Sequence, residues 1–146
     1  QIVVAGARAA VERAIEIAKG RGAKRAMLLP VSAPFHCALM KPAADRLAER
    51  LRDVALVKPN IAVINNVDVA IEDDPERIRD ALVRQASSPV RWIELIQAIA
   101  GRGTAHIIEC GPGKVLAGMT KRIVKEVGAG SAHDAASLEQ SIGAVK

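Results

Sequence analysis

Short apolar runs alternate with segments of helical periodicity along most of this chain, and that order limits the folds it can adopt. Runs rich in Ile, Val and Leu predict strands at residues 2–5, 26–31, 61–64 and 106–110. Apolar residues spaced three or four apart predict helices at residues 9–19, 38–54, 75–85, 89–100, 115–127 and 137–145. Strands that alternate with helices favour an α/β fold, in which residues 2–31 would form a βαβ unit with a right-handed crossover.

Capping residues predict where several of these helices begin. Asp74 can cap a helix whose first position is Pro75, a residue that the first turn of a helix tolerates well. Ser88 followed by Pro89 repeats this pattern, so we expect a second helix with Ser88 as its cap. The small and polar residues 128–136 predict a loose connection.

Length and composition bound the class of protein. With 146 residues, 50% of them hydrophobic, the chain can form one domain with a sizeable core. It contains no run of about 18 apolar residues that could cross a membrane. It begins at Gln1 inside a strand pattern, so we expect a piece of a longer protein. Two cysteines are too few for a disulfide framework, and they favour a reduced, cytoplasmic setting.

Two local patterns leave alternatives open. His36 beside Cys37, and His106 four residues before Cys110, could be metal ligands, but a paired C-x-x-C is missing and buried thiols explain both cysteines. The glycines of CGPGKVLAG follow a strand and precede a helix, where backbone N–H groups can bind an anion. Neither the phosphate-loop pattern nor the dinucleotide fingerprint is complete there. A tight structural turn therefore competes with a phosphate site.

The net charge is +5, and the first 60 residues hold eleven Lys and Arg against five Asp and Glu. A basic surface of this kind fits nucleic acid, a membrane surface or an acidic protein. Phe35 and Trp92 are the only aromatic residues in the sequence, so stacking on exposed bases has little support. A solvated surface without a partner is the alternative reading.

His36 is the residue whose place in the sequence most favours chemistry. It follows the carboxyl end of a predicted strand, the edge at which α/β proteins tend to bind ligands. A structural histidine remains the alternative, because a histidine that acts as a general base needs a nucleophile. The chain has six serines, but it lacks the G-x-S-x-G pattern of a nucleophile elbow. The sequence thus offers a base without its nucleophile.

Five blocks of sequence together resemble one enzyme family. They are AKRAMLLPVSAPFHCALMKPAADRLA, INNVDV, IRDALVRQ, SPVRW and ECGPGKVLAGMTKRIV. In this order they resemble malonyl-CoA:acyl carrier protein transacylase, and the similarity extends over residues 1–127. The resemblance implies the C-terminal half of that enzyme, with part of its α/β acyltransferase fold. Residues 1–41 would be the second half of a ferredoxin-like small subdomain, and residues 42–146 would be the C-terminal part of a hydrolase-like large subdomain.

The resemblance also implies roles for individual residues. His36 matches the catalytic histidine, which activates a serine that carries malonyl as an ester. Gln85 matches the position whose main-chain carbonyl orients that histidine. Phe35 matches an aromatic residue that goes with selection of malonyl over methylmalonyl. The positions that would dock the acidic acyl carrier protein are Lys24, Arg25, Lys121 and Arg122.

Several parts of the family's site have no counterpart in this sequence. The oxyanion-hole segment, the nucleophile elbow and the arginine that pairs with the malonyl carboxylate belong to the N-terminal half. We therefore expect an acyltransferase of fatty acid biosynthesis whose histidine half is this chain, inactive alone, with malonyl-CoA, acyl carrier protein and the missing half as partners and no cofactor. The alternative is a non-catalytic piece that binds acyl carrier protein or serves only structurally. Ala86 and Ser87 replace a leucine and an aromatic residue, which thins the packing near Gln85.

Overall fold

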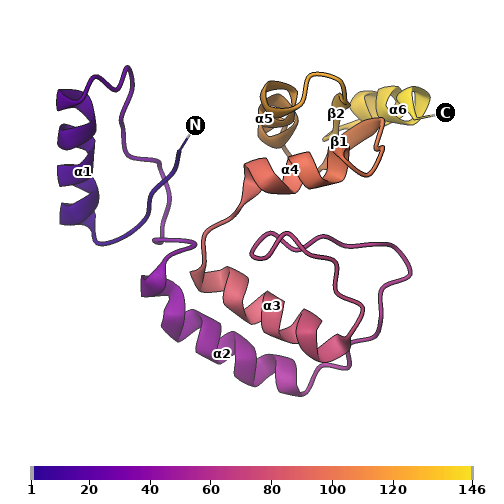
Figure 1. Ribbon diagram of the computed structural model, residues 1–146, viewed down its shortest axis with the longest axis horizontal. Coiled ribbons are helices and arrows are strands. Elements are labelled where there is room, and N and C mark those ends of the chain that lie inside the picture. The colour runs from indigo at the N-terminus through magenta and orange to yellow at the C-terminus, as the bar shows by residue number, and fades with distance from the viewer. Residues whose placement is uncertain (1, 146) are drawn as a thin grey trace. The chain divides into compact units, whose positions relative to one another are not determined.

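The computed structural model describes residues 2–145 and divides the chain into two compact units, Gln1–Val90 and Arg91–Lys146. We call these the first unit and the second unit, and describe each by itself. Helices dominate both units, and the only sheet among the described residues lies in the second (Figure 1). The α/β class is therefore confirmed. The predicted subdomain boundary between residues 41 and 42 concerns the complete enzyme and stays a prediction.

The described part of the first unit contains three α-helices and one turn of 3-10 helix. They are α1 (Arg8–Gly20), η1 (Ala38–Met40), α2 (Lys41–Arg52) and α3 (Pro75–Ser87). The predicted start of α3 is confirmed, because the Asp74 carboxylate accepts a hydrogen bond of 3.0 Å from the backbone N–H of Arg77. Helices α2 and α3 lie side by side (Figure 1), and the buried small side chains Ala44 and Ala81 belong to these two helices.

The strands predicted in the first unit do not form. Residues 2–5 and 26–31 belong to no regular element, and 61–64 contributes a single bridge, between Ile64 and Ile71. A strand needs a neighbour for its backbone N–H and C=O groups, and no described residue supplies one to the first two segments. Their apolar character is nevertheless real, since many of their side chains are exposed: Ile2, Val3, Val4, Met27, Leu28, Leu29 and Val31.

The second unit is a βαβ arrangement with two further helices. Its elements are α4 (Trp92–Ala100), β1 (His106–Cys110), α5 (Val115–Ile123), β2 (Gly128–Ala132) and α6 (Ala135–Ala144). Strands β1 and β2 pair in parallel, from His106 opposite Gly128 to Cys110 opposite Ala132. Helix α5 packs against both strands, α6 packs against β2, and α4 packs on α5. The buried core of this unit consists of Leu95, Ile96, Ala117, Thr120 and Ser141.

Two predictions about the second half of the chain are wrong. Ser88 is the extended residue after α3, Pro89 and Val90 belong to no helix, and α4 begins at Trp92 with Arg91 as its cap. Residues 128–132 are not loose but form β2, since glycines and alanines there fit closely against β1. Gly130, for example, lies so close to β1 and α6 that an added Cβ would be 3.1 Å from Ile108 and 3.4 Å from Ser141.

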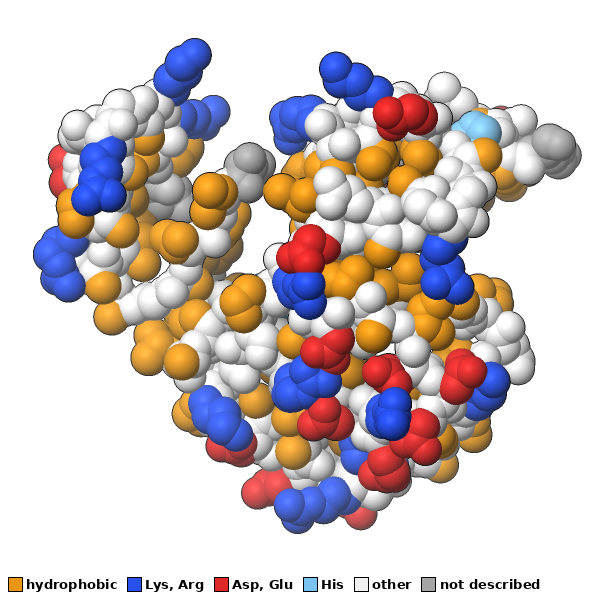
Figure 2. Space-filling model, viewed as in Figure 1, with side chains coloured by type: hydrophobic (Ala, Val, Ile, Leu, Met, Phe, Trp, Pro, Cys, Tyr) orange, Lys and Arg blue, Asp and Glu red, His pale blue; other side chains and the backbone are white. Residues whose placement is uncertain are grey.

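The described residues leave much apolar surface exposed. Their accessible area is 10527 Å², whereas two separate compact domains of these lengths would together expose about 8,600 Å². Hydrophobic side chains lie between charged ones over the face drawn in Figure 2. Together the two units therefore expose more surface than two self-contained domains of these lengths would.

Gly128→Ala tests the close approach of β1 and β2. An added Cβ would lie 2.4 Å from Cδ2 of His106 and 2.8 Å from its Nε2, so the imidazole ring must move. Overpacking of this kind costs about 1–3 kcal/mol, and we expect that loss in the free energy of unfolding measured in urea by circular dichroism. The matched control is Gly128→Ala combined with His106→Ala, which removes the ring. Equal losses with and without the ring would contradict this packing.

Candidate active site

His36 lies in a tight turn just before η1, and its backbone is left-handed. Its φ angle is +60°, a conformation that few residues other than glycine adopt and that often marks functional positions. Local bonds hold the turn, because Phe35 N–H donates to the Ala33 carbonyl at 2.9 Å and Cys37 Sγ–H donates to the Pro34 carbonyl at 3.1 Å. The turn leaves the imidazole exposed, where it can meet a substrate.

The His36 imidazole is held by the main chain of Gln85. Nδ1 of His36 lies 3.0 Å from the carbonyl oxygen of Gln85, 49 positions later in the sequence. A carbonyl oxygen can only accept, so Nδ1 is the nitrogen that donates and carries the proton in the neutral ring. Nε2 then keeps its lone pair, as a general base requires.

The Gln85 carbonyl is available because of the residues that follow it. In a continued helix, this oxygen would accept from the N–H of residue 89, but Pro89 has no N–H and α3 ends at Ser87. The oxygen therefore bonds to His36 where a longer helix would have bonded it to a further turn. It also carries part of the negative end of the α3 dipole, which favours positive charge on an imidazole.

Arg84, next to Gln85, connects α3 to the preceding loop. Its Nη1 and Nη2 donate to the two carboxylate oxygens of Asp68 at 2.8 and 2.6 Å, and its Nε donates to Asp80 at 2.6 Å. These bonds, the one to Asp68 first and then the one to Asp80, hold the pKa of the Arg84 guanidinium above its usual value. No pattern in the sequence singles out this residue.

The loop that carries Asp68 is itself tightly bonded. The Asn65 side chain accepts from Asp68 N–H at 2.7 Å and donates to the Ala70 carbonyl at 3.0 Å. Val69 has a φ angle of +59°, which is costly for a β-branched residue. The bridge between Ile64 and Ile71 closes the loop at its base. The INNVDV block thus forms a rigid turn that presents Asp68 to Arg84.

The remaining predicted site residues are placed as follows. Phe35 is next to His36 and 48% exposed, so its ring lies at the surface of the first unit. Lys24 and Arg25 are exposed in the first unit, and Lys121 and Arg122 are exposed on α5 of the second. The structure thus brings His36 and Gln85 together, with Phe35 beside the histidine. It does not place the two basic pairs relative to each other.

A serine and a histidine also meet in the second unit, but their contacts belong to a helix cap. Ser131 Oγ lies 3.1 Å from His133 Nδ1, and Asp134 Oδ2 lies 3.4 Å from His133 Nε2. The Asp134 carboxylate accepts from Ser137 N–H at 2.8 Å in a capping box at the start of α6. That hydrogen bonding with Ser137 lowers the pKa of Asp134. These residues stabilise a helix end.

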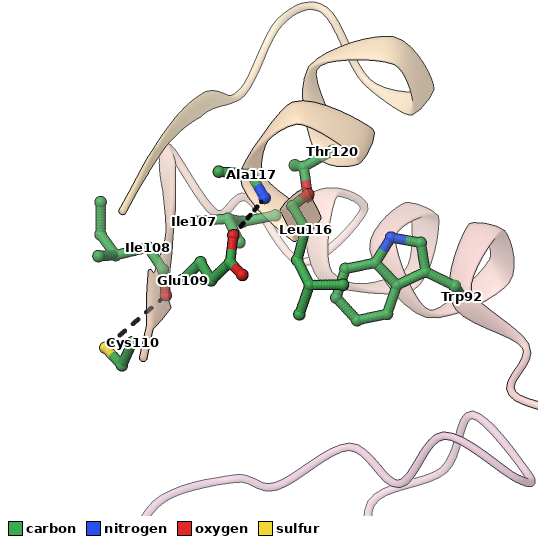
Figure 3. A pocket seen from close by; sticks show the side chains of 8 residues that line it. All are labelled: Trp92, Ile107, Ile108, Glu109, Cys110, Leu116, Ala117 and Thr120. Carbon is green, nitrogen blue, oxygen red and sulfur yellow. Dashed lines mark hydrogen bonds between the residues drawn. The ribbon is translucent and has the colours of Figure 1, made fainter. Parts of the chain in front are cut away.

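The glycine loop after β1 favours a structural turn over a phosphate site. The Glu109 carboxylate accepts from the backbone N–H of Ala117 at 2.9 Å, so the first turn of α5 already has a negative partner (Figure 3). Trp92, Leu116 and Thr120 line a cavity of about 220 Å³ beside it, which is mostly apolar. A phosphate bound there would lie close to a carboxylate of the same chain, which would repel it.

Two further findings concern the described residues, 2–145. Within them, no group of three or more His, Cys, Asp or Glu side chains is arranged to hold a metal ion. The pairs His36–Cys37 and His106–Cys110 therefore lack the additional ligands that a site would need. Over the same residues, no helix is both long and apolar enough to span a membrane.

Sequence comparison finds close relatives among the transacylases. Malonyl CoA-acyl carrier protein transacylase of Salmonella typhimurium is 51% identical over 142 residues, which is 97% of this chain and 46% of the relative. The Haemophilus influenzae protein of the same name is 55% identical over 138 residues, 94% of this chain and 44% of the relative. No family model matches the chain.

Solved structures agree with these relatives. An acyl-carrier-protein S-malonyltransferase from Burkholderia pseudomallei matches with a TM-score of 0.90 and 56% identity, over 94% of this chain and 45% of that one. A malonyl-transacylase solved in complex with its type II PKS acyl-carrier protein matches with a TM-score of 0.91 and 51% identity over the same shares. The chain is therefore a homologue of the malonyl CoA-acyl carrier protein transacylases, and it spans about half the length of the relatives it matches.

Proposed function

We propose that this chain supplies the histidine half of a malonyl-CoA:acyl carrier protein transacylase. The observation that carries the proposal is the 3.0 Å contact between His36 Nδ1 and the Gln85 carbonyl, which leaves Nε2 free to accept a proton. In this reading the chain is the C-terminal half of the enzyme. The nucleophilic serine, the oxyanion hole and the arginine for the malonyl carboxylate come from the other half.

The transfer then takes two steps, both of which use His36. In the first, Nε2 accepts the serine proton as the serine oxygen attacks the malonyl thioester, and it returns that proton to the departing sulfur of coenzyme A. In the second, Nε2 takes the proton of the carrier protein's thiol, and the sulfur attacks the malonyl ester. The serine oxygen leaves and regains the proton. No cofactor takes part in either step.

A neutral acceptor on Nδ1 suits this chemistry. The Gln85 carbonyl fixes the tautomer, as the aspartate of a Ser-His-Asp triad does, but it stabilises the imidazolium less than a carboxylate would. The partial charge at the end of α3 adds to that stabilisation. The proposed base is thus oriented by one backbone oxygen without a second ionised side chain.

The proposed partners follow from the same assignment. Malonyl-CoA is the donor and the acidic acyl carrier protein is the acceptor, docked through the basic pairs Lys24–Arg25 and Lys121–Arg122. We keep the cytoplasmic setting as part of the proposal, because both cysteines are free thiols. The alternative is a piece that binds acyl carrier protein or serves only structurally. It predicts no dependence of malonyl transfer on His36.

A chimera tests the proposal. Residues 1–146 would replace the matching part of the Salmonella typhimurium transacylase, and malonyl transfer from coenzyme A to acyl carrier protein would be measured. His36→Ala should lower kcat/KM about 10²- to 10⁴-fold, as expected for loss of a general base. The matched control is His133→Ala, which removes an exposed histidine of the second unit and should leave the rate unchanged. A His36→Ala chimera as active as the control would favour the alternative.

The same chimera tests the role of Phe35. A ring beside the base crowds the α-methyl group of methylmalonyl, and discrimination of one methyl group is worth about 1–3 kcal/mol. Phe35→Ala should therefore raise kcat/KM for methylmalonyl-CoA relative to malonyl-CoA by about 10- to 100-fold. Phe35→Leu, which keeps much of the bulk, serves as the control. An unchanged ratio in Phe35→Ala would show that the ring does not select the acyl group.

A further inference from the structure

The last turn of α3 carries the oxygen that orients His36, yet little in its own sequence holds that turn. Ala86 and Ser87 have small side chains, and Pro89 cannot donate a hydrogen bond back to the helix. The final carbonyls of a helix lack intrahelical partners, so its last turn frays readily unless other contacts fix it. A contact from outside the helix has to supply the missing restraint on Gln85.

The Arg84 guanidinium supplies such a contact from the neighbouring position. Its paired bonds to both oxygens of Asp68, at 2.8 and 2.6 Å, fix the plane of the guanidinium, and the bond to Asp80 ties it to the previous turn. Because the arginine spans from the helix to the loop, these bonds restrain the movement of its backbone. The next peptide carbonyl along the chain is that of Gln85.

The loop that carries Asp68 is rigid enough to hold the Arg84 guanidinium in place. The Asn65 side chain bonds to the backbone of both Asp68 and Ala70, and Asn65 N–H also donates to the Ala70 carbonyl at 2.9 Å. Val69 keeps its unfavourable backbone conformation within this network. A strained residue persists only where its surroundings hold it firmly.

We propose that Arg84, through Asp68, is a positioning residue that holds the Gln85 carbonyl against His36 Nδ1. This inference rests on the proposed function, in which His36 is the base. It deepens that function by assigning the orientation of the imidazole to an ion pair outside the reacting groups. Arg84 and Asp68 act on the histidine through the Gln85 peptide group.

The Arg84–Asp68 ion pair differs from a contact that only stabilises the fold. The side chains of Arg84 and Asp68 are 41% and 36% exposed, and ion pairs so open to water contribute little to overall stability. Arg79, one and a half turns earlier on α3, is 19% exposed and donates to the Val54 carbonyl at 3.2 Å. Removing Arg79 should therefore affect stability at least as much, without affecting the end of α3. It offers a matched control.

The first test reads the His36 tautomer in the full 146-residue chain by ¹⁵N NMR of labelled histidines. In the unaltered chain His36 should carry its proton on Nδ1. Arg84→Ala should shift it toward the Nε2–H form that free imidazoles favour, and Asp68→Asn should do the same. Arg84→Lys keeps the positive charge but cannot donate two parallel hydrogen bonds to Asp68. It should therefore retain only part of the Nδ1–H form. Arg79→Ala should leave the tautomer unchanged.

The second test measures the same variants in the chimera. Misplacement of a catalytic group by about 1 Å can cost about 100-fold in rate, so Arg84→Ala should lower kcat by about 10- to 100-fold while KM changes little. Arg79→Ala should keep kcat within about twofold of the unaltered chimera. Asp68→Asn keeps the shape of the loop residue. It therefore tests whether the Arg84–Asp68 pair positions His36 even where Arg84→Ala fails to fold.

An unchanged tautomer in both Arg84→Ala and Asp68→Asn would overturn the inference, as would an equal shift in Arg79→Ala. These outcomes differ from failure of the proposed function, which would appear as full activity of the His36→Ala chimera. The tautomer is read in the chain alone and needs no turnover. The NMR test therefore shows whether Arg84 positions the imidazole, independently of the reaction that His36 serves.

Discussion

The hydrogen bond between His36 and the Gln85 carbonyl joins two segments of the first unit that lie 49 residues apart in sequence. On one side, a left-handed turn projects an exposed imidazole ahead of η1 and α2. On the other, α3 ends where Pro89 frees a carbonyl, with α3 itself packed along α2. The pairing of these two helices, with Ala44 and Ala81 buried on them, therefore brings the two ends of this hydrogen bond together.

The remainder of the structure is consistent with a chain that corresponds to about half of its relatives. Apolar segments predicted as strands are exposed and unpaired within the described residues, and the second unit has a sheet of only two strands. An enzyme with the full sheet would bury such surface and pair such segments. In our account, the same missing half supplies the sheet partners and the serine that His36 activates.

Local chemistry predicted much of the fold from the sequence. The cap at Asp74, the proline in the first turn of α3 and the run His106–Cys110 all behave as short-range rules expect. The strands at 2–5 and 26–31 failed because strand formation needs a partner that these residues do not include. Residues 128–132 were missed because β2 consists of glycine, alanine and serine, whose value lies in close packing and not in β propensity.

The candidate site could be predicted only in part, because its contacts join segments that lie far apart in the sequence. His36 stood out by its place after an apolar run, but Gln85 contacts it through the backbone, which side-chain chemistry does not reveal. Proline four residues after Gln85 is a local signal that could have identified the free carbonyl. The bonds from Arg84 to Asp68 depend on a loop 16 residues away in sequence, and spacing alone does not predict them.

The most direct test of the central claim is the intact mass of both halves after incubation with malonyl-CoA. The account predicts that this chain, of 15.4 kDa, gains no malonyl group when alone. Mixed with the N-terminal part of a relative, it should enable one malonyl group to attach to that partner and none to itself. A malonyl adduct on this chain, at Ser131 or any other serine, would contradict the claim that it holds the base but not the nucleophile.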